Sequence, residues 1–176
     1  MRLLKRLSHL TAVLGLLLAW MALAVPAQAA QADVQLLQSY VGSWRGSGIL
    51  TGGTEPEKFS CRMTITKGKE GKIHYAGRCS LAGLNLSVAG TIAYIDAAGR
   101  YEAVMTSNAT FSGTAVGIRQ GDSVVFNLRE RDTNEQGTEM TITSRVVLRG
   151  GGITVDFDVL FNETGERMKA AVPFKR

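Results

Sequence analysis

Apolar residues occupy every second position in one segment after another, from Phe59 to the C-terminus. A period of two is typical of β-strands that bury one face and expose the other, so the sequence predicts an almost entirely β protein. The clearest case is the segment 59–81, where a turn at 67–71 allows the two halves to pair. This pairing sets Cys61 opposite Cys79 and predicts further inward pairs, Met63 with Gly77 and Ile65 with Tyr75.

Alternating segments of the same kind, separated by short turns, fill most of the remaining chain. A turn at 120–122 sets Val116 opposite Phe126, which predicts that Thr114, Val116 and Ile118 face inward. A turn at 149–152 predicts two further pairs, Val146 with Val155 and Arg145 with Asp156. Together the pattern predicts about ten strands, near 44–50, 59–66, 74–81, 84–94, 101–105, 114–118, 124–128, 140–148, 153–161 and 168–174.

Ten antiparallel strands with one apolar face each can bury that face in an up-and-down barrel or in a sandwich. The barrel is favoured because no long crossover connection is visible. Pro173 cannot donate to a strand ladder, so the closing strand is expected to be an edge or to carry a bulge. An outer-membrane barrel is excluded because the outward positions are polar, namely Arg62, Thr64, Thr141, Thr143, Arg145, Asp156 and Asp158.

A short helix is predicted before the first strand, at one end of the barrel. Asp33 is a suitable N-cap, and Gly42 is a suitable stop. Between them, Val34, Leu37 and Val41 share one face of the helix. The predicted fold class is therefore an all-β, antiparallel up-and-down barrel with a short N-terminal helix.

The first 29 residues have the pattern of a secretory signal peptide. Three basic residues precede an apolar stretch over 10–25, and the triplet Ala-Gln-Ala at 27–29 suits cleavage. The alternative, an uncleaved membrane anchor, is disfavoured because sixteen apolar residues fall short of the roughly 20 that span a bilayer. We expect a signal peptide over 1–29 and one exported barrel domain over 30–176, periplasmic or secreted, with no transmembrane span after cleavage.

Cleavage would also remove most of the apparent basicity. The chain has 20 Lys and Arg against 15 Asp and Glu, and the predicted signal contains three of the basic residues and none of the acidic ones, which leaves 17 against 15. The remaining basic residues are scattered along the chain, so we expect no nucleic-acid partner. In an oxidising compartment, Cys61 and Cys79 are expected to form a structural disulfide. A redox-active pair is a weaker alternative, because they are not in a CxxC turn.

No catalytic motif is visible, and an enzyme is the least favoured class. His74, the one histidine after the signal, lies at an outward position, and no serine is in a GxSxG motif. Asp156 and Asp158 also share the outward face, where solvation explains them better than acid–base catalysis. We expect no catalytic residues, no metal site and no cofactor, since two cysteines cannot make a structural zinc site.

Arg62 faces Arg78 in the predicted cystine hairpin. Like charges directly opposed on paired strands are unfavourable unless something neutralises them. An acid from another strand, such as Glu57, is the favoured explanation. An anionic headgroup or partner that docks on the two arginines is the alternative.

Residues 36–48, LLQSYVGSWRGSG, resemble the opening of the calycin barrels, where a GxW element begins the first strand and the indole packs across one barrel end. The spacing of Gly42, Trp44, Gly46 and Gly48 is closest to that of nitrobindin-like and fatty-acid-binding-like ten-stranded barrels, and the plain GxW is shared by lipocalins. The resemblance implies that the interior holds a small hydrophobic molecule or haem. Nitrobindin-like proteins hold haem through a histidine near the C-terminus, and the corresponding segment 167–172 has none, which disfavours histidine-ligated haem.

The favoured function is therefore an exported barrel that binds a small apolar or amphipathic ligand. Small inward residues are expected to leave room for it, namely Gly77, Gly90, Ala103 and Ser144. The interior is expected to be lined by Trp44, Tyr75, Leu86, Tyr94, Tyr101, Met105, Phe126, Phe157 and Phe174, although tyrosine and methionine commonly serve only to fill cores.

The alternative is a filled barrel that acts as an envelope-support or protein-interaction module, including a protease-inhibitor-like one, with an envelope protein as its partner. A cavity of about 300 Å³ or more would favour the ligand binder. Side chains that meet in the middle would favour the filled module.

Overall fold

The computed structural model describes residues 25–81, 84–108, 112–133 and 137–176. The chain divides into two units, Met1–Asp33 and Val34–Arg176. Most of the predicted signal peptide lies outside the described residues. No helix among the described residues has the length and hydropathy required to cross a bilayer.

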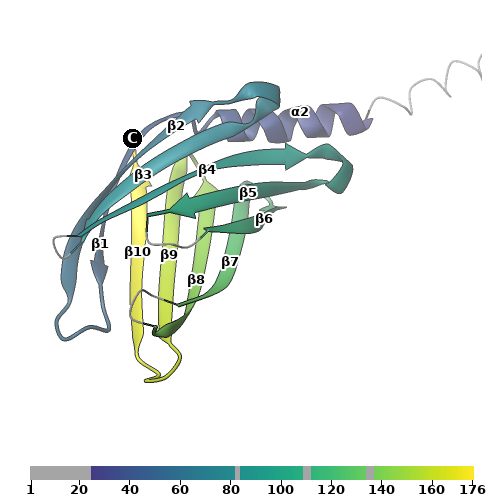
Figure 1. Ribbon diagram of the computed structural model, residues 1–176. Helices are drawn as coiled ribbons and strands as arrows, with labels where there is room; N and C mark the ends of the chain where they lie inside the picture. The colour runs from purple at the N-terminus through teal and green to yellow at the C-terminus, as the bar shows by residue number, and fades with distance from the viewer. Residues whose placement is uncertain (1–24, 82–83, 109–111, 134–136) are drawn as a thin grey trace, which may run out of the picture. The chain divides into compact units, whose positions relative to one another are not determined.

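The second unit contains a closed barrel of ten antiparallel strands, each paired with its neighbours in the chain (Figure 1). This confirms the predicted fold class and the number of strands. The first and last strands pair with each other and close the barrel. The strands are β1 (Gly42–Leu50), β2 (Glu57–Lys67), β3 (Ile73–Leu81), β4 (Leu84–Ile95), β5 (Arg100–Ser107), β6 (Ser112–Gln120), β7 (Ser123–Thr133), β8 (Glu139–Arg149), β9 (Gly152–Phe161) and β10 (Arg167–Lys175).

The two clearest predicted hairpins have the predicted register. Cys61 lies opposite Cys79 in the β2–β3 ladder, and the two form a disulfide. The β8–β9 ladder pairs Val146 with Val155. In both hairpins a strong alternation on each strand leaves one register in which both apolar faces point to the interior, because a slip by one residue would turn a whole strand inside out.

The β6–β7 hairpin differs from the prediction by one residue. Gly117, rather than Val116, lies opposite Phe126, so that Gly113, Ala115 and Gly117 face inward. Val116 and Ile118 are 43% and 58% exposed. The reason is the Phe126 ring, because a Cβ on Gly117 would lie 2.4 Å from its Cε1 atom. The interior has no space for valine or isoleucine side chains beside that ring.

The N-terminal helix α2 (Val25–Gln38) also differs from the prediction. Asp33 lies inside the helix rather than at its N-cap, and the helix ends at Gln38 rather than near Gly42. The segment before Asp33 is rich in alanine, the residue with the highest helix propensity, and this extends the helix backwards. Of the three residues expected to share one helix face, Leu37 is fully buried in the core, and Val41 lies beyond the end of the helix.

The β1–β10 closure is the shortest ladder of the barrel, with two register pairs, Arg45–Lys175 and Gly46–Phe174. An isolated bridge joins Thr51 to Lys169 further along the same two strands. Between them lies Pro173, which has no N–H to donate. The expectation that the closing strand would be an edge or carry a bulge is wrong, because β10 is paired on both sides and the pairs before and after Pro173 keep the same register.

The glycines of the opening motif allow the two closing strands to approach each other. A Cβ at Gly46 would lie 2.7 Å from Val172 Cγ1 and 3.0 Å from the Pro173 carbonyl oxygen. A Cβ at Gly48 would lie 2.7 Å from the carbonyl oxygen of Ala171. The GxWxGxG spacing therefore has a steric purpose, because a side chain at either glycine would push β10 away from β1.

We predict that Gly46→Ala lowers the free energy of unfolding by about 1–3 kcal/mol, the usual cost of inserting a group into a packed site. Urea unfolding measures it. Gly53→Ala is the matched control, because the nearest atom to a Cβ there is 4.0 Å away. Equal losses in the two variants would contradict the role assigned to the seam glycine.

We predict that the Cys61→Ala/Cys79→Ala double variant is less stable than the oxidised protein by about 3 kcal/mol, because the bridge restricts the unfolded chain. Urea unfolding with and without reductant measures this. Reductant should lower the stability of the native sequence towards that of the variant and leave the variant unchanged. A native sequence that is insensitive to reductant would contradict the prediction.

Candidate functional site

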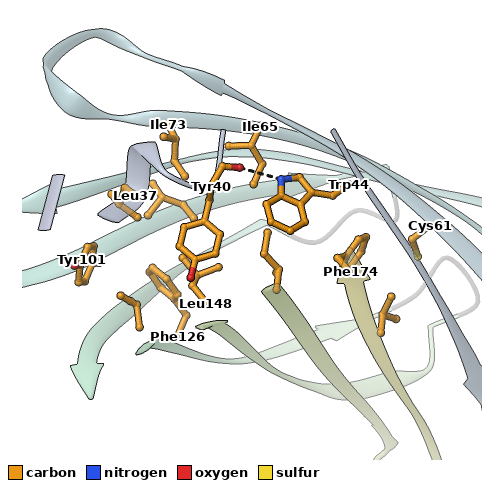
Figure 2. Close-up of a cluster of buried hydrophobic side chains, with 14 residues drawn as sticks. Leu37, Tyr40, Trp44, Cys61, Ile65, Ile73, Tyr101, Phe126, Leu148 and Phe174 are labelled. Carbon is orange, nitrogen blue, oxygen red and sulfur yellow. Dashed lines mark hydrogen bonds between the residues drawn. The ribbon is translucent and has the colours of Figure 1, made fainter. Parts of the chain in front are cut away.

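One end of the barrel interior is filled by large side chains. Odd-numbered strands begin at this end and even-numbered strands finish there. Five fully buried residues, Leu37, Tyr40, Trp44, Ile73 and Tyr101, form what we call the end cluster (Figure 2). They belong to the last turn of α2, the segment after it, and the first residues of β1, β3 and β5. The segment that leads into the first strand therefore helps to fill this end of the barrel.

Trp44 is held in the end cluster from three sides. Its indole Nε1 donates a 2.9 Å hydrogen bond to the Tyr40 carbonyl, and the two rings stack at 6.1 Å between centroids (Figure 2). The Arg176 guanidinium lies 4.8 Å from the centre of the indole and donates to the Ser39 carbonyl. A buried indole N–H needs an acceptor, and this one is provided four residues earlier in the chain.

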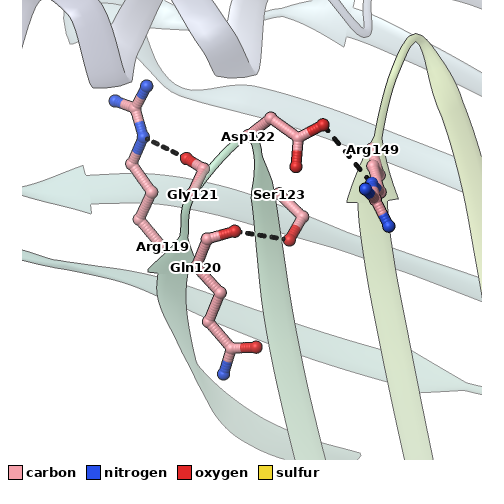
Figure 3. Close-up of polar contacts among 6 residues, drawn as sticks. All are labelled: Arg119, Gln120, Gly121, Asp122, Ser123 and Arg149. Carbon is pink, nitrogen blue, oxygen red and sulfur yellow. Dashed lines mark hydrogen bonds and ion pairs between the residues drawn. The ribbon is translucent and has the colours of Figure 1, made fainter.

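The turns at the same end are joined to one another. Arg149 of the β8–β9 turn pairs with Asp122 of the β6–β7 turn at 3.3 Å (Figure 3). Within the second turn, Ser123 donates to the Gln120 carbonyl at 2.8 Å. Burial raises the pKa of the Tyr40 hydroxyl, and a hydrogen bond from the Gly151 backbone opposes that shift. These contacts connect neighbouring turns at the filled end of the barrel.

The rest of the interior contains a cavity of about 240 Å³. Its wall is formed by inward-facing residues of all ten strands, with the exposed Arg62 and Arg78 at its border. Most are aliphatic or aromatic. Of the nine residues predicted to line the interior, six do so: Tyr75, Leu86, Met105, Phe126, Phe157 and Phe174.

The other three predicted lining residues lie elsewhere. Trp44 and Tyr101 belong to the end cluster, and Tyr94 packs against the buried core. The rings of Tyr94 and Tyr101 meet edge to face at 5.1 Å, and Tyr101 in turn meets Phe126 at 6.3 Å. These three side chains point inward, as the alternation predicts. They lie at the end of the barrel that the end cluster fills, however, and not in the cavity wall.

Further wall residues have the same inward parity but were not predicted as lining residues. Gly113 and Ala115 come from β6, whose register was predicted wrongly. The other strands also contribute apolar side chains, for which alternation alone was a sufficient signal. Examples are Leu50, Phe59, Val88, Leu128, Ile142, Val155 and Val172.

Two hydroxyl-bearing residues interrupt the apolar wall. Tyr75 donates a 3.3 Å hydrogen bond to the Val104 carbonyl, and burial raises the pKa of its phenol to about 12. Ser144 faces inward between Leu128 and Phe157, and its hydroxyl has no hydrogen-bond partner among the described residues. An interior ligand could therefore find hydrogen-bonding groups at two points of an otherwise apolar cavity.

The small inward residues contribute unequally to the empty volume. Gly77, Ala103 and Ser144 lie in the cavity wall. The space beside Gly90 is instead filled by Tyr75, because a Cβ there would lie 2.6 Å from the ring atom Cζ and 2.0 Å from the Val104 carbonyl oxygen. The prediction that Gly90 leaves room for a ligand is therefore wrong.

The outer face carries His74, Asp156 and Asp158, the candidate catalytic groups of the sequence. Asp156 pairs with Arg145 at 3.9 Å, and Asp158 lies 3.4 Å from both Arg167 and Lys169. His74 Nδ1 contacts the Thr91 hydroxyl at 2.8 Å on the exposed face. In the part of the chain that the structure describes, no group of three or more His, Cys, Asp or Glu side chains is arranged to hold a metal ion.

Comparison with known proteins supports the fold. The barrel is similar to the crystal structure of Rv2717c from M. tuberculosis, with a TM-score of 0.63, 15% identity, and 81% of this chain and 96% of that chain covered. It is also similar to the S-type phycobiliprotein lyase CPES from Guillardia theta, with a TM-score of 0.52, 11% identity, and 80% and 89% covered. No protein-family model and no curated protein sequence matches the chain. The closed ten-stranded barrel agrees with the calycin-like architecture that the opening motif implied.

We predict that stability falls as the pH rises from about 10 to about 12, partly because of Tyr75. Its folded-state pKa of about 12 lies above the ordinary value of 10.0, so the unfolded state loses its proton first. The stabilising contribution is complete below pH 10 and is lost through this window. Urea unfolding against pH should give a shallower decline for Tyr75→Phe than for the native sequence. Parallel declines would contradict a buried, protonated Tyr75.

Proposed function

We propose that this protein is a barrel that binds a small apolar or amphipathic ligand in its interior. The observation that supports the proposal is a mostly apolar cavity of about 240 Å³ inside a closed barrel whose one end is filled by the end cluster. Protein interiors are normally packed without voids larger than a water molecule. A void of this size lowers stability unless something occupies it.

The cavity limits the size of the ligand. It is smaller than the expected 300 Å³, which is the lower end of the range for drug-sized pockets. An engineered apolar cavity of about 150 Å³ in another protein binds benzene. The ligand that fits here is therefore a single ring system or a short alkyl chain, with a polar group that can reach Tyr75 or Ser144.

A second candidate function is the filled barrel that acts as an envelope-support or interaction module. The small cavity favours it, because much of the interior is packed by Trp44, Tyr101 and Phe126. One structural neighbour is named a lyase, but at 11% identity that likeness concerns the fold alone. We place the ligand binder first because the cavity wall is continuous and mostly apolar.

We also infer that the protein is exported. The basic and apolar pattern of the first 29 residues supports this. The Cys61–Cys79 disulfide supports it as well, since such bonds persist in oxidising compartments. Both cysteines line the cavity, so an oxidising compartment would preserve a covalent bond that forms part of the binding site.

The cavity can be tested by filling it. Ala103 of β5 lies in the wall, and its neighbour Val104 points outward and is 51% exposed. We predict that Ala103→Leu weakens binding of 1-octanol, a short chain with one hydroxyl, by at least about tenfold, because the three added carbon atoms occupy the space of the ligand. Val104→Leu is the matched control and should bind like the native sequence. Isothermal titration calorimetry measures both.

Native mass spectrometry of the protein isolated from its own host provides a second measurement. A bound small molecule in the native sequence, absent from Ala103→Leu, would support the binder. Absence of any bound molecule, together with failure to bind both 1-octanol and indole, would favour the filled interaction module instead.

A further inference from the structure

A row of four basic residues crosses the outer face of four adjacent strands. Lys175 of β10 lies opposite Arg45 of β1, which lies opposite Arg62 of β2, which in turn lies opposite Arg78 of β3. All four are exposed. Neighbouring strands are separated by about 4.8 Å, so the row spans about 14 Å and sets like charges side by side. We call these four residues the cationic row.

No carboxylate of the described residues neutralises the cationic row. Among the described residues, no ion pair joins an acidic side chain to Lys175, Arg45, Arg62 or Arg78. The sequence favoured Glu57, on another strand, as the acid that neutralises Arg62 and Arg78, and this prediction is wrong. Glu57 is on β2 itself, at the opposite parity from Arg62.

The outer face of β8, β9 and β10 shows the contrasting arrangement. There, Arg145, Arg167 and Lys169 each lie within 4 Å of a carboxylate of Asp156 or Asp158. The same barrel therefore compensates its charges on one part of the outer face and leaves four cations together on another. Like charges directly opposed are destabilising, so the cationic row imposes a cost that the fold itself does not require.

The side chains on either side of the cationic row are short and uncharged. Two residues from the cationic row on β1, β2 and β3 lie the small residues Ser43, Thr64 and Ala76, and the same row continues on β4 with Ala89. In the other direction lie the polar neutral residues Ser47, Ser60 and Ser80 of β1, β2 and β3, continued by Asn85 of β4. The long basic side chains can therefore project beyond their neighbours towards a flat partner.

Two residues extend the same outer face beyond these rows. Ile49 of β1 is 49% exposed, and Lys58 of β2 lies directly opposite it. The face thus combines five cations with one exposed aliphatic side chain. It offers no exposed large aromatic residue for stacking a nucleic-acid base, at least among the described residues.

We propose that the cationic row docks the protein on an anionic phospholipid bilayer. Guanidinium groups match the geometry of phosphate, and juxtaposed Lys and Arg are attracted to the negative surface potential of such membranes. A bilayer fits better than a folded protein, because lipid headgroups move laterally and can each settle against one cation of the row. A protein interface would instead require apolar anchors at its centre, and the flanking rows provide only small or polar side chains.

This docking surface does not depend on the interior cavity. The four side chains of the cationic row are exposed on the outer parity; Arg62 and Arg78 also border the cavity beside the disulfide, whereas the rest of the cavity wall is formed by inward-facing residues. Failure to bind 1-octanol would leave the membrane proposal unaffected, and failure to bind membranes would leave the cavity proposal unaffected. The two are measured with different probes.

Vesicle sedimentation tests the proposal on the protein isolated after secretion. We expect it to bind vesicles that mix phosphatidylglycerol with phosphatidylcholine, to lose this binding at high salt, and not to bind phosphatidylcholine alone. Arg62→Gln/Arg78→Gln should weaken binding at least about tenfold, since each basic residue near an anionic surface contributes several-fold in affinity. Its thermal midpoint should be unchanged or higher, because a repulsion has been removed.

Arg129→Gln/Arg131→Gln is the matched control. Both residues are exposed on β7, opposite Thr143 and Thr141, and the double variant has the same net charge as the test variant. It should bind like the native sequence. Equal weakening by the two double variants would overturn the proposal, as would no binding of the native sequence to the anionic vesicles. Binding to soluble polyphosphate without binding to vesicles would also overturn it, in favour of a soluble polyanion.

Discussion

A closed barrel has one interior, and every strand must turn the same parity towards it. This constraint determines the rest of the structure, because the register of each ladder decides which side chains meet inside and which meet solvent. The Cys61–Cys79 disulfide joins two inward-facing residues that lie directly opposite each other on neighbouring strands, so a covalent bond holds the register of that ladder. Once these strands are set, the adjacent ladders transmit the parity around the barrel as far as β10, where Phe174 meets Gly46 and closes the sheet.

The same constraint explains how much could be predicted from the sequence. Where both strands of a hairpin alternate strongly, as around Val146 and Val155, one register buries both faces and the prediction is confirmed. β6 offers apolar residues at one parity and glycine and alanine at the other, so alternation alone favoured Val116. The deciding contact is the Phe126 ring over Gly117, which depends on the three-dimensional position of a residue from the next strand.

The sequence predicted which side chains point into the barrel, but not where they lie along the barrel axis. Trp44, Tyr101 and Phe126 all point inward as expected, yet only Phe126 reaches the cavity wall. Position along the barrel axis depends on where each strand starts, and Trp44 and Tyr101 lie at the beginning of β1 and β5. Large side chains gathered at strand starts make a plug, whereas small ones further along, such as Gly77 and Ala103, leave the space beyond it empty.

The outer face is free of the packing constraint, so its pattern is informative in another way. Inward residues are selected by volume, but outward residues can vary without loss of fold, and Asp156 and Asp158 show that this barrel can compensate basic neighbours on adjacent strands. Arg45, Arg62 and Arg78 lie on three successive strands, and no acidic side chain in the described part of the chain pairs with them. Because directly opposed like charges lower stability, their alignment points to an anionic surface outside the molecule. Register alone, derived from the inner face, brings these three arginines together from positions sixteen or more residues apart in the chain.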